Sequence, residues 1–131
     1  MSNPSKAKGT AAETKVVKYL NTHGVFAERK ALAGEKDKGD LRAVLPDGTE
    51  VTIEVKAGMQ TASPSRSLMD LWLCQTIKEG WNSGTPAYAL VVVRYRHKLC
   101  DAEVWIPMDT GRTMMYLDEF ARITDAKEIF G

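Results

Sequence analysis

The chain has 131 residues, of which 44% are hydrophobic and 27% are charged, so it fits one globular domain and is neither disordered nor collagen-like. It contains two cysteines and two histidines, with no C-x-x-C or H-x-x-x-H spacing, which excludes zinc fingers and zinc hydrolases. The formal net charge is +1, but residues 1–30 hold six Lys/Arg and only two Asp/Glu. We therefore expect this part of the chain to favour a polyanion.

The apolar runs in the sequence are short. The longest, residues 87–93, is far below the roughly 18 residues that a membrane span needs. The N-terminus also lacks the apolar core of a signal peptide. These features predict a cytoplasmic protein with reduced thiols.

The N-terminal region predicts an arm followed by a helix. Residues 1–9 are small, polar and basic, and we expect them to form a flexible arm. Thr10 and Glu13 have capping-box spacing, which predicts a helix that begins at Thr10 and ends near Gly24. Glu13 also shares a helical face with three apolar residues, Val16, Val17 and Leu20. Glu13 could thus cap the helix, contribute a carboxylate to a site, or do both.

The remaining elements follow from hydrophobic periodicity and turn residues. They are strands over 25–32, 40–45 and 50–57, a helix over 67–79 ended by Gly80, strands over 88–95 and 102–106, and a helix over 114–123. The order α-β-β-β-α-β-β-α predicts an α/β fold: a mixed sheet of about five strands flanked by helices, in one domain over residues 10–131.

The helix over 67–79 carries apolar residues around most of its circumference. A helix of this kind is buried on both sides or forms half of a subunit interface. We therefore expect a homodimer.

The strand over 50–57 alternates between an apolar and a charged face. Period two places Glu54 and Lys56 side by side on the face opposite Val51, Ile53 and Val55. An E-x-K triplet of this kind is also common on solvent-facing strands. Its combination with an acid at the start of the preceding strand favours a functional site.

The turn Pro46-Asp47-Gly48 predicts a hairpin between the strands over 40–45 and 50–57. If the loop has three residues, Leu45 pairs with Thr49 and Asp40 falls opposite Glu54. Two opposed carboxylates need a compensating cation, and Mg²⁺ is the commonest in phosphate chemistry. A different loop length would shift this pairing.

The constellation Glu13, Gly39-Asp40 and Glu54-Val55-Lys56 resembles the PD-(D/E)XK nuclease superfamily, which has the restriction-endonuclease-like fold. Within it, the segments Lys8-Gly-Thr-Ala-Ala-Glu13, Glu28-Arg-Lys30, Lys38-Gly-Asp40 and Ile53-Glu-Val-Lys56 are most similar to archaeal-type Holliday junction resolvases, some of which phages encode. The resemblance covers mainly residues 8–57. One departure is that the loop Gly34-Glu-Lys-Asp-Lys-Gly39 lacks the serine that these resolvases carry before the first acid.

The resemblance implies a role for each matching residue. Asp40, Glu54 and the Val55 carbonyl would hold Mg²⁺, for which Mn²⁺ could substitute, and Glu13 would ligate a second ion or its water. Lys56 would orient or help to deprotonate the attacking water, and the products would carry a 5′-phosphate and a 3′-hydroxyl. The expected phosphate contacts are the basic residues near these acids: Lys8, Arg29, Lys30, Lys36, Lys38 and Arg66.

The resemblance therefore implies a metal-dependent endonuclease that resolves four-way DNA junctions by paired, symmetric phosphodiester hydrolysis. A two-fold enzyme would present two sites to the nearly two-fold symmetric junction. Three alternatives stay open: a linear-duplex endonuclease of restriction or repair type, a catalytically inactive nucleic-acid-binding module, and an α/β protein that does not bind DNA.

Overall fold

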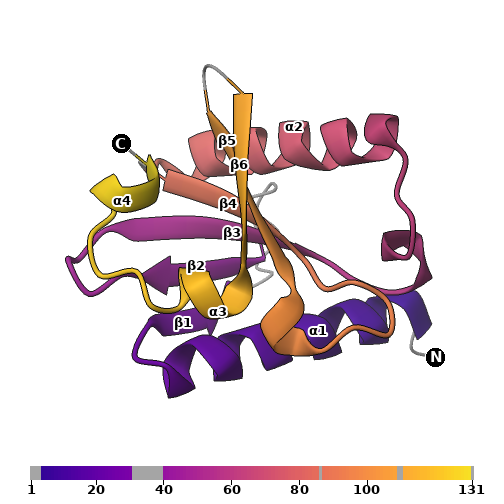
Figure 1. Cartoon of the computed structure of the whole chain (residues 1–131), viewed down its shortest axis with the longest axis horizontal. Coiled ribbons are helices and arrows are strands. Elements are labelled where there is room, and N and C mark those ends of the chain that lie inside the picture. The colour runs from indigo at the N-terminus through magenta and orange to yellow at the C-terminus, as the bar shows by residue number, and fades with distance from the viewer. Residues whose placement is uncertain (1–3, 31–39, 86, 109–110, 131) are drawn as a thin grey trace.

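The computed structural model describes residues 4–30, 40–85, 87–108 and 111–130, with only the backbone for residues 4–10 (Figure 1). In chain order the elements are α1 (Pro4–Thr22), β1 (Phe26–Arg29), β2 (Leu41–Val44), β3 (Glu50–Lys56), η1 (Met59–Thr61), α2 (Arg66–Ser83), β4 (Ala87–Val92), η2 (Leu99–Asp101), β5 (Glu103–Met108), β6 (Gly111–Tyr116), α3 (Leu117–Phe120) and α4 (Lys127–Phe130).

The strands form one mixed sheet in the order β1-β2-β3-β4-β5-β6. Only the central pair, β3 and β4, is parallel, and α2 makes the crossover between them. The other neighbouring strands are antiparallel. The predicted α/β class, with a mixed sheet flanked by helices, is therefore confirmed.

Helices cover both faces of the sheet, with α1 and α2 on opposite sides (Figure 1). The larger core lies on the α1 side, where Val16 and Leu20 pack against alternate residues of the strands, such as Ile53. The smaller core lies under α2 and includes Trp72 and Leu90. The central strands are thus buried on both faces, which is typical of a sheet between two helical layers.

The hairpin loop between β2 and β3 has three residues. Leu45 N donates to Thr49 O at 2.9 Å, and Gly48 N donates to Leu45 O at 2.8 Å. Gly48 has φ 91°, a left-handed conformation that glycine adopts without steric cost. The predicted pairing of Leu45 with Thr49 is confirmed, and it sets the register Leu41↔Ile53.

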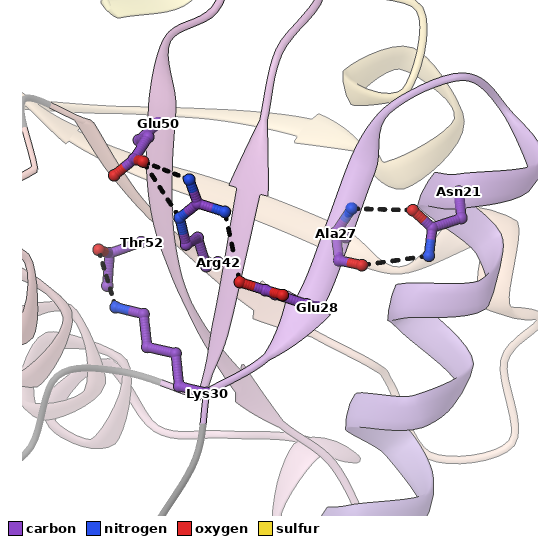
Figure 2. A network of polar contacts seen from close by, with 7 residues as sticks. All are labelled: Asn21, Ala27, Glu28, Lys30, Arg42, Glu50 and Thr52. Atoms are coloured by element: carbon purple, nitrogen blue, oxygen red, sulfur yellow. Dashed lines mark hydrogen bonds and ion pairs between the residues drawn. The ribbon is translucent and has the colours of Figure 1, made fainter.

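The polar contacts in Figure 2 fasten β1 to its neighbours. The Asn21 side chain, in α1, accepts from Ala27 N at 2.8 Å and donates to Ala27 O at 3.1 Å. Arg42 of β2 pairs with Glu28 of β1 at 3.3 Å and with Glu50 of β3. These contacts hold β1 beside β2 at an edge of the sheet.

The first helix starts earlier than predicted. α1 begins at Pro4, so Thr10 lies inside the helix and Glu13 is not part of a capping box. Proline suits the first position of a helix because that residue has no helical partner for an N–H group, and the alanines and lysines that follow favour continuation. Of the predicted arm, residues 4–9 are helical, while residues 1–3 lie outside the described part of the chain.

The second helix ends later than predicted. Gly80 lies within α2, and Gly84, at φ 67°, ends it. Gly80 is needed for packing, since a Cβ at this position would lie 2.3 Å from Cδ1 of Tyr88 in β4. At the other end Ser65 is the N-cap, and its side chain accepts from Leu68 N at 3.1 Å.

The predicted C-terminal helix over 114–123 is wrong in its first half. Residues Gly111–Tyr116 form the sixth strand, β6, which pairs antiparallel with β5 from Met108↔Gly111 to Glu103↔Tyr116. Helix α3 is confined to Leu117–Phe120. The hairpin partner decides the conformation here, because tertiary pairing overrides the helical preference of the two methionines.

Among the described helices, none is both long enough and apolar enough to span a bilayer.

Candidate active site

The β2–β3 register brings Asp40 to Glu54. The strand pairing ends at Leu41↔Ile53, and Asp40 directly precedes β2. Asp40 N donates to Ile53 O at 3.0 Å, which holds Asp40 against β3, near enough to Glu54 for its charge to affect that carboxyl. The length of a turn at one end of the hairpin thereby determines which acid meets Glu54 at the other end.

Asp40 is held in place by backbone on both sides. Its Oδ2 accepts from Val55 N at 2.9 Å, and its carbonyl accepts from Lys30 N at 3.0 Å. The Asp40 side chain also forms a hydrogen bond with the carboxyl of Glu13. Asp40 therefore links α1, β1 and β3.

Glu13 lies on the face of α1 that points to the sheet, and its side chain is 15% exposed. Burial, followed by the charge of Asp40, raises the pKa of Glu13, and the guanidinium of Arg29 opposes this shift. Arg29 Nη2 lies 3.8 Å from Glu13 Oε2. Glu13, which lies on the same face of α1 as the apolar residues of the core, thus belongs to the same cluster as Asp40.

Glu54 and Lys56 are neighbours, as the strand periodicity predicts. Lys56 Nζ lies 3.4 Å from Glu54 Oε1. Glu54 is only 6% exposed, so the interpretation of this triplet as a solvated strand face is wrong. Burial under α2, a hydrogen bond with Glu79 and the charges of Asp40 and Glu79 raise the pKa of Glu54 to about 10, although Lys56 opposes the shift.

Glu79 of α2 is a member of the cluster that the sequence analysis missed. It is 9% exposed and shares a hydrogen bond with Glu54. The available signal was helical spacing, because Glu79 falls on the same face of α2 as the buried Trp72 and Thr76. The predicted helix over 67–79 contained all three residues, but the sequence did not show that this face packs against Glu54.

The predicted phosphate contacts fall into three groups. Arg66 is exposed at the start of α2, and Arg29 is partly exposed but pairs with Glu13. Lys30 Nζ donates to Ser83 Oγ at 2.8 Å and to Thr52 Oγ1 at 3.2 Å, so its ammonium joins β3 to α2 (Figure 2 shows the contact with Thr52). The side chain of Lys8, together with Lys36 and Lys38, lies outside the described residues.

The donor set at Asp40 and Glu54 fits a hard divalent cation. The carboxyl of Glu54 is buried and that of Asp40 is partly buried, and the pKa of Glu54 is raised first by burial and then by its hydrogen bond with Glu79 and the charge of Asp40. Within the described residues, no three side chains of His, Cys, Asp or Glu are placed to hold one ion. Mg²⁺ suits such a site because it commonly takes one or two carboxylates and completes its shell with water and substrate phosphate.

Comparisons with known proteins show a similarity in structure but none in sequence. The chain is similar in structure to Hjc of Archaeoglobus fulgidus, a Holliday junction resolvase from an archaeal hyperthermophile, with a TM-score of 0.47 and 17% sequence identity over 79% of this chain and 83% of that one. No protein-family model and no curated protein matches the sequence.

Side-chain contacts join Glu13 to Asp40 and Glu54 to Lys56, and the charge of Asp40 acts on Glu54, so the structure brings the four predicted site residues together. Chemically, this arrangement can bind a hard cation and present an ammonium group beside it.

Proposed function

We propose that the protein is a Mg²⁺-dependent endodeoxyribonuclease that resolves four-way DNA junctions, with Mn²⁺ able to replace Mg²⁺. The observation that carries this proposal is the proximity of Asp40, held by Val55 N, to Glu54, with Lys56 Nζ 3.4 Å from Glu54 Oε1. A buried carboxyl beside a second acid and one lysine is costly for a structural role alone and is suited to binding a cation and a phosphodiester.

In this proposal Asp40, Glu54 and the carbonyl of Val55 hold the ion. Bound there, Mg²⁺ would act as a Lewis acid on the scissile phosphate and neutralise charge that develops on it. Val55 N fixes one oxygen of Asp40, which restricts the directions in which that carboxylate can ligate. Glu13, hydrogen-bonded to Asp40, holds a second ion or orients water on the α1 side.

Lys56 acts directly on the reacting groups. Its side chain is 21% exposed, and β3 places its ammonium group beside Glu54. It can donate to a non-bridging phosphate oxygen or to the attacking water, and its positive charge stabilises the additional negative charge of the transition state. Hydrolysis would leave a 5′-phosphate and a 3′-hydroxyl.

We further propose that two copies act together. On α2 the apolar side chains of Leu71 and Trp81 are 54% and 77% exposed, and a second copy of the chain would cover them. A two-fold pair of chains would supply one site to each of the two strands cut in a four-way junction. Light scattering at micromolar concentration should give twice the mass of one chain.

The test is cleavage of a mobile four-way junction, a flap and a linear duplex, with and without Mg²⁺. We expect symmetric nicks in the junction that require Mg²⁺. Asp40→Asn and Glu54→Gln should each lower the rate by about 1,000-fold or more, and Lys56→Ala by about 100-fold or more. DNA binding should survive all three substitutions.

Glu50→Gln is the matched control, because Glu50 lies on the same strand but at its other end, where it pairs with Arg42. This variant should cleave like the wild type. Equal cleavage by wild type and Asp40→Asn would overturn the proposed site. Binding without cleavage would identify an inactive module, and equal rates on duplex and junction would identify a linear-duplex endonuclease.

A further inference from the structure

The segment after β4, residues Arg94–Lys98, is the most basic short run in the chain and has no part in the site described above. It reads Arg-Tyr-Arg-His-Lys, and we call it the basic turn. Arg96, His97 and Lys98 are exposed, and Tyr95 is 37% exposed. Three cationic side chains, Arg94, Arg96 and Lys98, and the aromatic ring of Tyr95 thus occur within five residues.

The basic turn lies at the same edge of the sheet as Lys56. Because β3 and β4 are parallel, their carboxyl ends meet there, and Val93 N donates to Lys56 O at 2.8 Å. Tyr95 N donates to Thr61 Oγ1 at 2.8 Å, which ties the turn to η1. Figure 1 shows η1 and the segment that follows β4, in orange, at the same end of the molecule.

Thr61 makes this anchor rigid. It is fully buried, and its hydroxyl also lies 2.7 Å from Gly58 O and 3.1 Å from Val93 O. Arg94 Nη2 adds a contact with Ala62 O at 3.3 Å. The basic turn is therefore held in a fixed position relative to Lys56, five residues before Thr61.

The backbone of the turn keeps a charged side chain where glycine would fit better. His97 N donates to Arg94 O at 3.0 Å, which closes a four-residue turn, and Arg96, its third residue, has φ 65°. Among the described residues, Arg96 alone has a positive φ without being glycine. A turn with this conformation at its third position favours glycine, because a Cβ there is strained.

Strain at an exposed position points to a role for the side chain. The Arg96 guanidinium lies 5.3 Å from the centre of the Tyr95 ring, so the aromatic ring orients the cation. Arg94 is paired with Glu103 at 3.7 Å, but within the described part of the chain neither Arg96 nor Lys98 forms an ion pair. The exposed cations Arg96 and Lys98 and the partly exposed Tyr95 ring therefore lie in a segment whose start, Val93, is hydrogen-bonded to Lys56.

We propose that the basic turn is a DNA-contact surface, in which Arg96 and Lys98 bind backbone phosphates of the strand that enters the candidate active site. This inference rests on the proposed function for its choice of partner, since a basic, aromatic-containing surface next to a phosphodiester site fits a nucleic-acid backbone. In this inference the DNA lies at the end of the sheet where β3 and β4 have their carboxyl ends, next to η1.

The test is a binding titration with the full-length protein in EDTA, where no cleavage occurs. Fluorescein-labelled four-way junction and linear duplex are followed by anisotropy over a range of salt concentrations. Arg96→Gly should weaken binding about 3- to 10-fold for either DNA and lower the slope of log Kd against log salt by about one, as expected for one lost phosphate contact. Arg96→Gly with Lys98→Ala should roughly double both effects.

Arg96→Gly also separates binding from folding. Because glycine relieves the strained φ, the melting temperature of this variant should equal or exceed that of the wild type, so weaker binding cannot come from a damaged fold. Lys127→Ala is the matched control: it removes one exposed charge at the start of α4, next to Ala126, whose N–H donates to Asp47 in the loop before β3, far from Lys56 at the other end of that strand. This control should bind DNA like the wild type.

Wild-type affinity and salt slope in Arg96→Gly and in the double variant would overturn the inference, as would equal losses in Lys127→Ala. A wild-type protein that binds no DNA would also overturn it. The proposed function fails separately: if the wild type binds DNA through Arg96 but cuts nothing in Mg²⁺, the contact surface stands and the nuclease does not.

Discussion

The two faces of β3 are buried to the same degree but carry opposite chemistry. Towards α1 it presents Val51, Ile53 and Val55, which join the larger core. Towards α2 it presents Thr52, which is fully buried, and Glu54, which is 6% exposed. One strand therefore supports a packed apolar layer with one set of residues and a polar, ionisable layer with the other.

The apolar face of β3 stabilises the fold, whereas the polar face reduces its stability. Burying Ile53 removes apolar surface from water, whereas burying Glu54 beside Asp40 and Glu79 raises its pKa and disfavours its ionised form. Because α2 covers the polar face, the carboxyls of Glu54 and Glu79 are removed from solvent. Four substitutions test the contrast, beginning with the largest expected effect.

Truncation on the apolar face should be the most destabilising change. Ile53→Ala removes a fully buried side chain between α1 and the sheet, and it should lower the free energy of unfolding by about 2–5 kcal/mol. Urea denaturation followed by circular dichroism measures this loss. A loss below about 1 kcal/mol would mean that the α1 core repacks freely around the gap.

The polar face should instead control how stability depends on pH. The folded protein holds the Glu54 proton more tightly than the unfolded chain, because the pKa is raised from an ordinary 4.5 to about 10. Its stabilising contribution is thus complete below the ordinary value and is lost as the pH rises towards 10. In EDTA, stability should fall by up to about 1.4 kcal/mol per pH unit, or up to about 3 kcal/mol between pH 6 and 8.

Glu54→Gln should flatten most of this pH dependence, and the remainder follows from Glu13, whose pKa is shifted in the same direction. Urea titrations at a series of pH values provide the measurement, with Glu50→Gln as the control that keeps the wild-type slope. An unchanged slope in Glu54→Gln would show that this carboxyl does not hold its proton in the folded state.

The packing of α2 over the polar face depends on Gly80. Gly80→Ala improves helix propensity, yet its Cβ would lie 2.3 Å from Tyr88 Cδ1 and 2.9 Å from Tyr88 Cβ, so helix and strand must separate. We expect a net loss of about 1–3 kcal/mol in thermal or urea unfolding. A stabilised variant would mean that propensity outweighs this contact, and Gly80→Ala with Tyr88→Ala should recover part of the loss.

The smallest effect is expected for Thr52→Val, which keeps the shape of the side chain. The Thr52 hydroxyl lies 2.8 Å from Thr85 Oγ1 and accepts from Lys30 Nζ, which also contacts Ser83. Loss of these contacts should cost about 1 kcal/mol. A loss as large as that of Ile53→Ala would remove the distinction between the two faces.

The central hairpin and its acids could be predicted from the sequence because local features determine them. Alternation of apolar and charged residues gives the faces of β3, and Pro46-Asp47-Gly48 favours a short loop. Counting residues from this loop then predicts that Asp40 and Glu54 lie near each other. Lys56 is two residues from Glu54 and lies beside it on any extended strand.

The rest of the site depends on packing that no local pattern contains. Glu79 reaches Glu54 only because α2 crosses β3, and the basic turn lies beside Lys56 only because β4 runs parallel to β3. The sixth strand escaped prediction for a similar reason, since Met114 and Met115 adopt a strand through pairing with β5. Tertiary structure therefore decides which helix face and which neighbouring strand contribute residues to the site.

The loop Pro46-Asp47-Gly48 makes the site vulnerable to changes in chain length far from it. An added or deleted residue in the loop would have to be absorbed there, or the strands would slide by one position. After such a slide, Asp40 would no longer face Glu54, even though every side chain of the site was intact. Insertions in this loop should therefore abolish the proposed cleavage activity although the loop lies far from the candidate site. Insertions in a surface loop that sets no strand register should leave that activity unchanged.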